Sequence, residues 1–129
     1  MALLREYKEI AYQWGIWKTE ESPEELLALL PDPERYEQQL TRFSSPHRKL
    51  EWLSVRVLLY QLLGEEKTIE YAPSGKPHLA DSSYFISISH TRGYVAVILS
   101  PVSEVGIDIE QYGQRVHTVS YTHLRAHET

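Results

Sequence analysis

Two acidic residues, Asp108 and Glu110, lie one residue apart in the otherwise apolar sequence VGIDIE. In a strand, successive side chains point to opposite faces, so the two carboxylates share one face and Val105, Ile107 and Ile109 share the other. Alternate Cα atoms in a strand are about 6–7 Å apart, a spacing that one divalent cation can bridge. We therefore expect the apolar face to pack and the acidic face to meet a cation or basic partners. A solvent-exposed face with two ordinary acids is the alternative.

Polar residues also collect at two predicted turns. Lys76 lies in the sequence SGKP, where the glycine lets the backbone approach a ligand closely. Ser89, His90, Thr91 and Arg92 lie at the end of the predicted strand YFISIS. Turns of this kind suit phosphate binding. Each has a simpler interpretation, because GKP is usually only a turn and a histidine at a strand end is more often a surface residue than a ligand.

Composition narrows the class of protein. The chain has 129 residues, of which 42% are hydrophobic and 24% charged, as expected for one globular domain. It has no cysteine, which excludes disulfides, thiol catalysis and thiolate zinc sites. A net charge of −5 argues against general nucleic-acid binding. No apolar run could span a bilayer, and the start MALLREYKEI is too charged for a signal peptide, so a cytoplasmic protein without membrane contact is expected.

A strand and three helices are predicted in the first half of the chain. The strand is EIAYQWGIWKT, in which apolar and aromatic residues alternate at Ile10, Tyr12, Trp14 and Ile16. Short helices are predicted in SPEELLALL and DPERYEQQLTRF, with Ser22 and Asp32 as N-caps, each followed by proline. The longest helix has Ser45 as N-cap and ends at Gly64. Its apolar face contains Leu50, Leu53, Val57, Leu58 and Leu62.

The second half changes to a period of two. KTIEYA, YFISIS, GYVAVILS and EVGIDIE are predicted strands separated by turn residues, and an antiparallel meander is their natural connection. The helices precede these strands instead of alternating with them. This order predicts an α+β fold in which helices pack on a small, mainly antiparallel sheet.

The motifs GKP, SISHTRGYVAV and VGIDIE, in this order and at these spacings, resemble the Sfp-type 4′-phosphopantetheinyl transferases. The helix HRKLEWLSVRVLL is similar to the basic helix that precedes those motifs in the family. The resemblance covers residues 42–112 well and the first 40 residues loosely. It implies transfer of the phosphopantetheine arm of coenzyme A to a serine of an acyl or peptidyl carrier protein. In the family, 3′,5′-ADP is released and Mg²⁺ binds the pyrophosphate.

The resemblance also implies roles for single residues. It assigns Asp108 and Glu110 to Mg²⁺, and Ser89, His90 and Lys76 to the phosphates of coenzyme A. Four basic residues of the long helix and the segment before it are further candidates for the anion, on inference alone: Arg42, Arg48, Lys49 and Arg56. The alternative for these four residues is a solvated helix face.

The sequence departs from the family in its second half. Family members contain two similar lobes, and the second carries a W-x-x-K-E-A-like motif that supplies a further metal-side acid and the lysine and acid suspected of deprotonating the carrier serine. No such motif follows residue 110, so residues 1–118 are predicted to be an N-terminal lobe that is inactive alone. An uncovered lobe interface is expected to promote self-association. The candidates include Trp14, Trp17 and the apolar strand residues, and the sequence does not identify which face is bare.

The last eleven residues, VSYTHLRAHET at 119–129, resemble the translation of a sequencing adapter. We predict that they form a non-native tail that is not part of the fold. A metal-binding pair formed by His123 and His127 is a weak alternative, because no third ligand lies nearby in the sequence.

The sequence allows two alternatives to the transferase. A serine hydrolase built from Ser89, His90 and Asp108 is disfavoured, because neighbouring strand residues point apart and no Gly-x-Ser-x-Gly elbow is present. A non-catalytic module that binds coenzyme A or a carrier protein is the stronger alternative, since it needs no second lobe.

Overall fold

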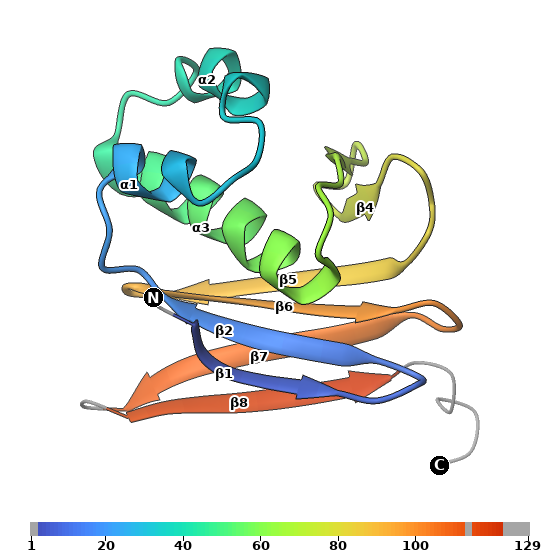
Figure 1. Cartoon of the computed structure of the whole chain (residues 1–129). Coiled ribbons are helices and arrows are strands. Elements are labelled where there is room, and N and C mark those ends of the chain that lie inside the picture. Colours follow the sequence, from blue (N-terminus) through green and yellow to red (C-terminus); the bar gives the residue numbers. More distant parts are fainter. Residues whose placement is uncertain (1–2, 113–114, 123–129) are drawn as a thin grey trace.

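The computed structural model describes residues 3–112 and 115–122 as three layers (Figure 1). Helices cover one face of a four-stranded sheet, and a two-stranded hairpin lies against the other face. The helices are α1 Pro23–Ala28, α2 Glu34–Leu40 and α3 Pro46–Leu63. The strands are β1 Leu3–Lys8, β2 Gln13–Lys18, β3 Ile69–Tyr71, β4 Pro77–Leu79, β5 Phe85–Thr91, β6 Tyr94–Ser100, β7 Val105–Tyr112 and β8 Arg115–Thr122. The predicted α+β class is confirmed.

The main sheet has the strand order β1-β2-β6-β5, and every neighbouring pair is antiparallel. β3 pairs with β4, and β7 pairs with β8, in two separate antiparallel ribbons. Of the predicted meander, only the β5–β6 step is confirmed. Its first step is wrong, because β3 pairs with β4 and not with β5, and its last step is wrong, because β7 does not pair with β6. β2 and β5 already occupy both edges of β6, so β7 packs against the open face of the sheet instead.

Local capping signals place two of the helices as predicted. Ser22 caps α1, and a capping box with Glu25 is complete. Ser45 caps α3, and its hydroxyl accepts a hydrogen bond from the backbone N–H of Arg48. Gly64 ends α3 in the left-handed conformation at φ 73°, which glycine adopts without strain.

The prediction that Asp32 caps α2 is wrong. The N-cap is Pro33, and no side chain caps the helix. The backbone carbonyl of Asp32 accepts a hydrogen bond from the N–H of Arg35 at 3.2 Å, so the main chain replaces the expected side-chain cap.

The first predicted strand is shorter than expected and has a partner that the sequence did not reveal. β2 begins at Gln13, whereas Ile10 is 99% exposed between β1 and β2. β1 escaped prediction because it is an edge strand whose residues are mostly exposed and polar, so it lacks apolar alternation. β4 and β8 were also missed, and β8 contains residues 119–122 of the predicted tail.

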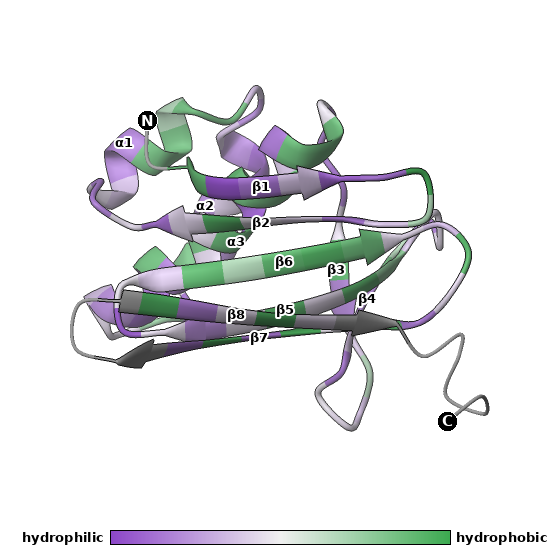
Figure 2. Ribbon diagram, turned by 90° about the horizontal axis from the view of Figure 1, so that it is seen from below, coloured by the Kyte–Doolittle hydropathy of each residue, from purple (hydrophilic) through white to green (hydrophobic). Residues whose placement is uncertain are grey.

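The core is divided by the sheet. On the helix side, α3 packs its apolar face on Val95, Val97 and Leu99 of β6. On the hairpin side, Val105, Ile107 and Ile109 of β7 join Ile16, Ala96 and Ile98, which confirms the predicted apolar face of VGIDIE. Figure 2 shows the apolar character of β6, which contributes to both cores.

The predicted exposure of Trp17 is wrong, since its side chain is 0% exposed in the helix-side core. β2 lies between β1 and β6, so its helix-facing residues are covered by α3. Trp14 is half-buried on the hairpin side. The large apolar side chains that remain exposed include Leu4, Tyr7, Phe85, Val102 and Val119. No helix in the described part of the chain is long and apolar enough to cross a membrane.

Gly15 allows α3 to approach β2 closely, which gives a prediction for stability. A Cβ atom at Gly15 would lie 3.0 Å from Leu58 Cδ1 and 3.2 Å from Leu62 Cδ2. We expect Gly15→Val to lower the free energy of unfolding by about 1–3 kcal/mol through overpacking, measured by urea denaturation. Lys18→Val is the control, because it adds the same side chain at the exposed end of β2 and should change stability by less than about 0.5 kcal/mol. Equal effects of the two changes would contradict this account.

Candidate functional site

A cavity of about 450 Å³ opens between the N-terminal half of α3, the end of β5 and the β3–β4 turn. Its basic lining residues are Arg42, Arg48, Arg56 and His90. Its aromatic lining residues are Phe43, Trp52 and Tyr71. Glu51 is the one acid among the described residues that line it. In a chain with a net charge of −5, this concentration of cationic side chains favours an anionic ligand.

Helical spacing brings the α3 residues to this cavity. Arg48, Glu51, Trp52 and Arg56 are separated by three, one and four positions, so they form one continuous face of α3. His90 reaches the same cavity because alternation along β5 directs Ile86, Ile88 and His90 toward the helices.

Arg56 is the most buried of the cations, with 6% of its surface exposed. Its guanidinium lies 3.9 Å from the centroid of the Trp52 ring. It donates hydrogen bonds to the Trp52 carbonyl at 3.3 Å and to the Tyr71 hydroxyl at 3.4 Å. No carboxylate of the described residues forms an ion pair with it. Burial lowers the pKa of Arg56, and an anion in the cavity would compensate its charge.

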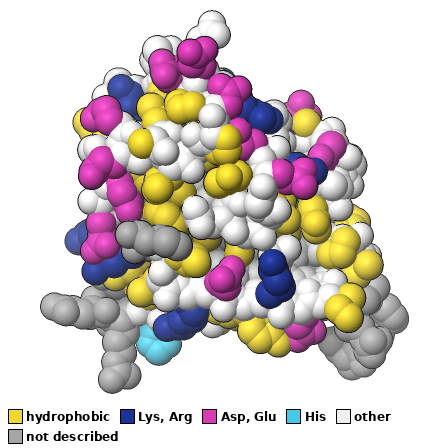
Figure 3. Space-filling model, viewed as in Figure 1, with side chains coloured by type: hydrophobic (Ala, Val, Ile, Leu, Met, Phe, Trp, Pro, Cys, Tyr) yellow, Lys and Arg dark blue, Asp and Glu magenta, His cyan; other side chains and the backbone are white. Residues whose placement is uncertain are grey.

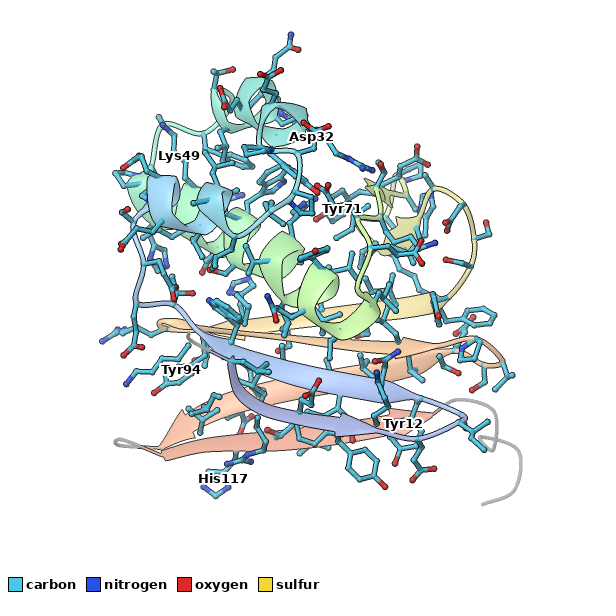
Figure 4. The ribbon with its side chains drawn as sticks, viewed as in Figure 1. Tyr12, Asp32, Lys49, Tyr71, Tyr94 and His117 are labelled. Atoms are coloured by element: carbon cyan, nitrogen blue, oxygen red, sulfur yellow. The ribbon has the colours of Figure 1, made fainter. Side chains whose placement is uncertain are left out.

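Aromatic packing fixes the Trp52 ring, against which the Arg56 guanidinium lies. The Tyr36 and Phe43 rings each lie 6.0 Å from the ring of Trp52. The Tyr36 hydroxyl donates a 2.6 Å hydrogen bond to Glu66, and burial, followed by that carboxylate, raises its pKa. Tyr71 reaches the cavity from β3, where Figure 4 shows it beside α3. These contacts preorganise the wall behind the guanidinium.

The two carboxylates of β7 lie on its outer face, as predicted. Asp108 and Glu110 are exposed, whereas Ile107 and Ile109 are buried. Ser89 Oγ donates to Asp108 Oδ1 at 3.1 Å and accepts from the backbone N–H of Ile109 at 3.2 Å. Ser89 therefore ties the edge strand β5 to β7 and orients one of the two acids.

Glu110 lies opposite His117 in the β7–β8 register. Figure 4 shows His117 on the β8 strand at the side of the hairpin away from the helices. Among the described residues, no group of three His, Cys, Asp or Glu side chains is arranged to hold a metal ion. A cation between Asp108 and Glu110 would thus need further oxygen ligands from a bound substrate or water, as Mg²⁺ commonly does.

Ser89 and His90 face opposite sides of β5. Ser89 bonds to Asp108 on the hairpin side, whereas His90 Nδ1 lies 3.2 Å from Glu51 Oε2 on the helix side. They cannot act as nucleophile and base toward each other, which agrees with the argument against a serine hydrolase. The cavity and the carboxylate pair consequently lie on the two sides of one edge strand.

The structure does not place every predicted ligand in this cavity. Lys76 lines a second, largely apolar cavity of about 360 Å³, where its Nζ lies 3.7 Å from Glu104 Oε2. Its neighbours Gly75 and Pro77 do line the first cavity. Lys49 is half-buried at the α3 end near α2 (Figure 4) and is not among the described residues that line the cavity. The predicted anion ligands that line one cavity are thus Arg42, Arg48, Arg56 and His90.

The sequence reasoning missed Glu51, Trp52 and Tyr71. Two features of the sequence could have indicated the first two. Arg56 interrupts the apolar sequence WLSVRVLL, which indicates a buried cation one helical turn after Trp52. Glu51 lies four positions after His47, a spacing at which helix side chains pair. Tyr71 gave no such signal, because only the tertiary fold brings β3 to the side of α3.

The chain is similar in sequence to curated 4′-phosphopantetheinyl transferases. It is 38% identical over 64 residues to proteins named 4′-phosphopantetheinyl transferase AcpT from Salmonella typhi and Escherichia coli strain K12. The AcpT protein of Salmonella typhimurium gives the same identity over the same length. The matched segment is 49% of this chain and 33% of each relative. No family model matches the chain.

These matches establish a phosphopantetheinyl transferase relationship over about half of the chain, and the relatives are enzymes of the transferase class. The α+β architecture is consistent with one lobe of that fold. The aligned part corresponds to about a third of the length of the curated relatives.

Proposed function

We propose that this chain is the coenzyme A-binding part of a 4′-phosphopantetheinyl transferase that modifies a serine of an acyl or peptidyl carrier protein. The observation that carries the proposal is the buried guanidinium of Arg56, which lines a cavity with Arg42, Arg48 and His90 and has no carboxylate partner among the described residues. The sequence relationship to named phosphopantetheinyl transferases supports the choice of ligand.

Coenzyme A has the chemistry that this cavity requires. Its phosphate groups are anionic, and arginine binds phosphate oxygens with paired, charge-assisted hydrogen bonds. Its adenine ring can stack on an aromatic side chain, for which Tyr71, 50% exposed, is available on the cavity wall. The acidic side chains on the surface in Figure 3 gather mainly over the helical layer, so the cationic cavity is a local feature.

Mg²⁺ fits the residues of β7, since two exposed carboxylates on one strand face match its preference for oxygen. Asp108 and Glu110 would hold it. When bound, it would neutralise charge on the pyrophosphate of coenzyme A. Ser89 would keep Asp108 in position through its 3.1 Å hydrogen bond.

The proposed reaction is a phosphoryl-type transfer. The carrier serine Oγ forms a bond to the phosphorus that bears the pantetheine arm, and the bond from that phosphorus to 3′,5′-ADP breaks. Arg48, Arg56 and His90 would bind and orient the phosphates, which is the positioning and electrostatic work that dominates such reactions. The serine proton would leave to a base in the second lobe, because the resemblance places the lysine and acid motif there.

A non-catalytic module that binds coenzyme A or a carrier protein remains the second candidate. It would use the same cationic cavity and needs no second lobe. Both candidates require coenzyme A or carrier recognition, and only the first belongs to a protein that transfers the arm.

We expect the chain to bind coenzyme A and Arg48→Ala to weaken binding at least about tenfold, because a charge-assisted hydrogen bond to phosphate is lost. Isothermal titration calorimetry measures the affinity. The matched control is Arg5→Ala, which removes the same charge from β1 at the opposite edge of the sheet. An equal loss in both variants would mean that only overall charge matters.

Mg²⁺ should strengthen the binding of coenzyme A, since the pyrophosphate completes the oxygen ligands that the two β7 acids begin. We expect this enhancement to disappear in the double variant Asp108→Asn with Glu110→Gln. Asp32→Asn with Glu34→Gln removes two acids from the helical layer and should keep the enhancement. A metal effect that survives the β7 changes would overturn the assignment of these acids.

The chain alone should bind coenzyme A without appreciable transfer, because it lacks the groups expected to activate the serine. The purified chain is mixed with apo carrier protein, Mg²⁺ and coenzyme A, and the carrier is weighed by mass spectrometry. Efficient addition of phosphopantetheine would show that the second lobe is not needed. A full-length protein that binds coenzyme A but never modifies carriers would favour the non-catalytic module.

A further inference from the structure

Glu51 is an unexpected residue in a cavity that is otherwise suited to an anion. It is the one acid among the described lining residues, and its side chain is 21% exposed. Its Oε2 atom lies 3.2 Å from His90 Nδ1 and 3.2 Å from His47 Nε2. One carboxylate oxygen therefore contacts imidazoles from two different elements, β5 and α3.

The negative charge of Glu51 by itself would disfavour the binding of an anionic ligand. A carboxylate that lines the same cavity as the phosphates of a ligand repels them, so its removal would tighten the binding of coenzyme A. The contacts indicate an opposing effect. A carboxylate that accepts a hydrogen bond from one ring nitrogen fixes the orientation of the imidazole and the nitrogen that carries the proton.

We propose that Glu51 is the positioning residue for His90, an inference that rests on the proposed binding of coenzyme A. The Glu51 Oε2 atom lies 3.2 Å from His90 Nδ1, where a protonated Nδ1 would donate to it and hold the ring at the cavity wall. When both ring nitrogens carry protons, Nδ1–H stays on Glu51 and Nε2–H is left to donate to a phosphate oxygen. The recognition of coenzyme A would then depend on Glu51 although Glu51 repels it.

The contact to His47 serves a different purpose. His47 and Glu51 lie four positions apart on α3, and such pairs form readily on a helix surface. His47 does not line the cavity of His90 among its described residues, so it steadies the carboxylate without meeting the ligand. We expect His47→Ala to change the affinity for coenzyme A by less than about twofold.

The test compares two replacements of Glu51 in the 129-residue chain. Both Glu51→Ala and Glu51→Gln remove the negative charge, but the glutamine oxygen can still accept from Nδ1–H. We expect Glu51→Ala to weaken coenzyme A binding about fivefold, the size of one lost hydrogen bond, and Glu51→Gln to stay within about twofold of the original chain. Tighter or unchanged binding in Glu51→Ala would overturn the proposal.

A double-variant cycle identifies the partner. In a His90→Ala background, Glu51→Ala should cause no further loss, because the ring that it positions is gone. An undiminished loss there would show that Glu51 acts through another group. Glu70→Ala is the matched control, since Glu70 Oε1 contacts His78 Nε2 at the same 3.2 Å outside this cavity, and its removal should leave the affinity unchanged.

A readout without ligand separates this proposal from the proposed function. Nitrogen-15 spectra of the histidine side chains in the ligand-free chain report which ring nitrogen carries a proton. His90 should have a protonated Nδ1 in the original chain and in Glu51→Gln, and should shift toward the other tautomer in Glu51→Ala. Identical His90 spectra in all three would refute the positioning role. Failure to bind coenzyme A, with the spectral change present, would refute only the proposed ligand.

Discussion

The packing of α3 across the four-stranded sheet determines where every residue of the cavity lies. Gly15 lets Leu58 and Leu62 sit close to β2, and the buried β6 strand supports the helix beside it. With its C-terminal half fixed in this way, the N-terminal half of α3 extends over the end of β5. Arg48 and Arg56 consequently meet His90, which is far from them in the sequence. The same contact that forms the core therefore forms the cavity.

The cavity combines charges that would not gather on an ordinary surface. Arg56 is buried against Trp52 without a carboxylate partner among the described residues, and burying a guanidinium in this way costs stability. The arrangement is explained if an anion supplies the missing charge. Glu51 does not fill that role, because its carboxylate is engaged with His47 and His90. Binding and stability are therefore coupled at this wall, and an anionic ligand would stabilise the fold.

The edge strand β5 separates two kinds of chemistry that are adjacent in the sequence. His90 belongs to the cationic cavity, while Ser89 bonds to Asp108 beside the acidic face of β7. An edge strand suits this division, because a ligand can pass around it without crossing the sheet. The proposed binding of coenzyme A with Mg²⁺ requires the ligand to reach both sides of this strand.

The sequence by itself determined the features that depend on neighbouring residues. These include the capped ends of α1 and α3, the alternation that buries Ile107 and exposes Asp108, the α+β class and the motifs of the transferase resemblance. Only the tertiary structure decided the features that depend on distant partners. β7 does not pair with β6, because both edges of β6 are occupied. Lys76 forms an ion pair with Glu104, and Tyr71 and Glu51 line the cavity. Capping hydrogen bonds and side-chain periodicity depend on residues that are close in the sequence, so the sequence predicts them. The pairing of faces depends on how the whole chain packs around its two cores, so only the tertiary structure decides it.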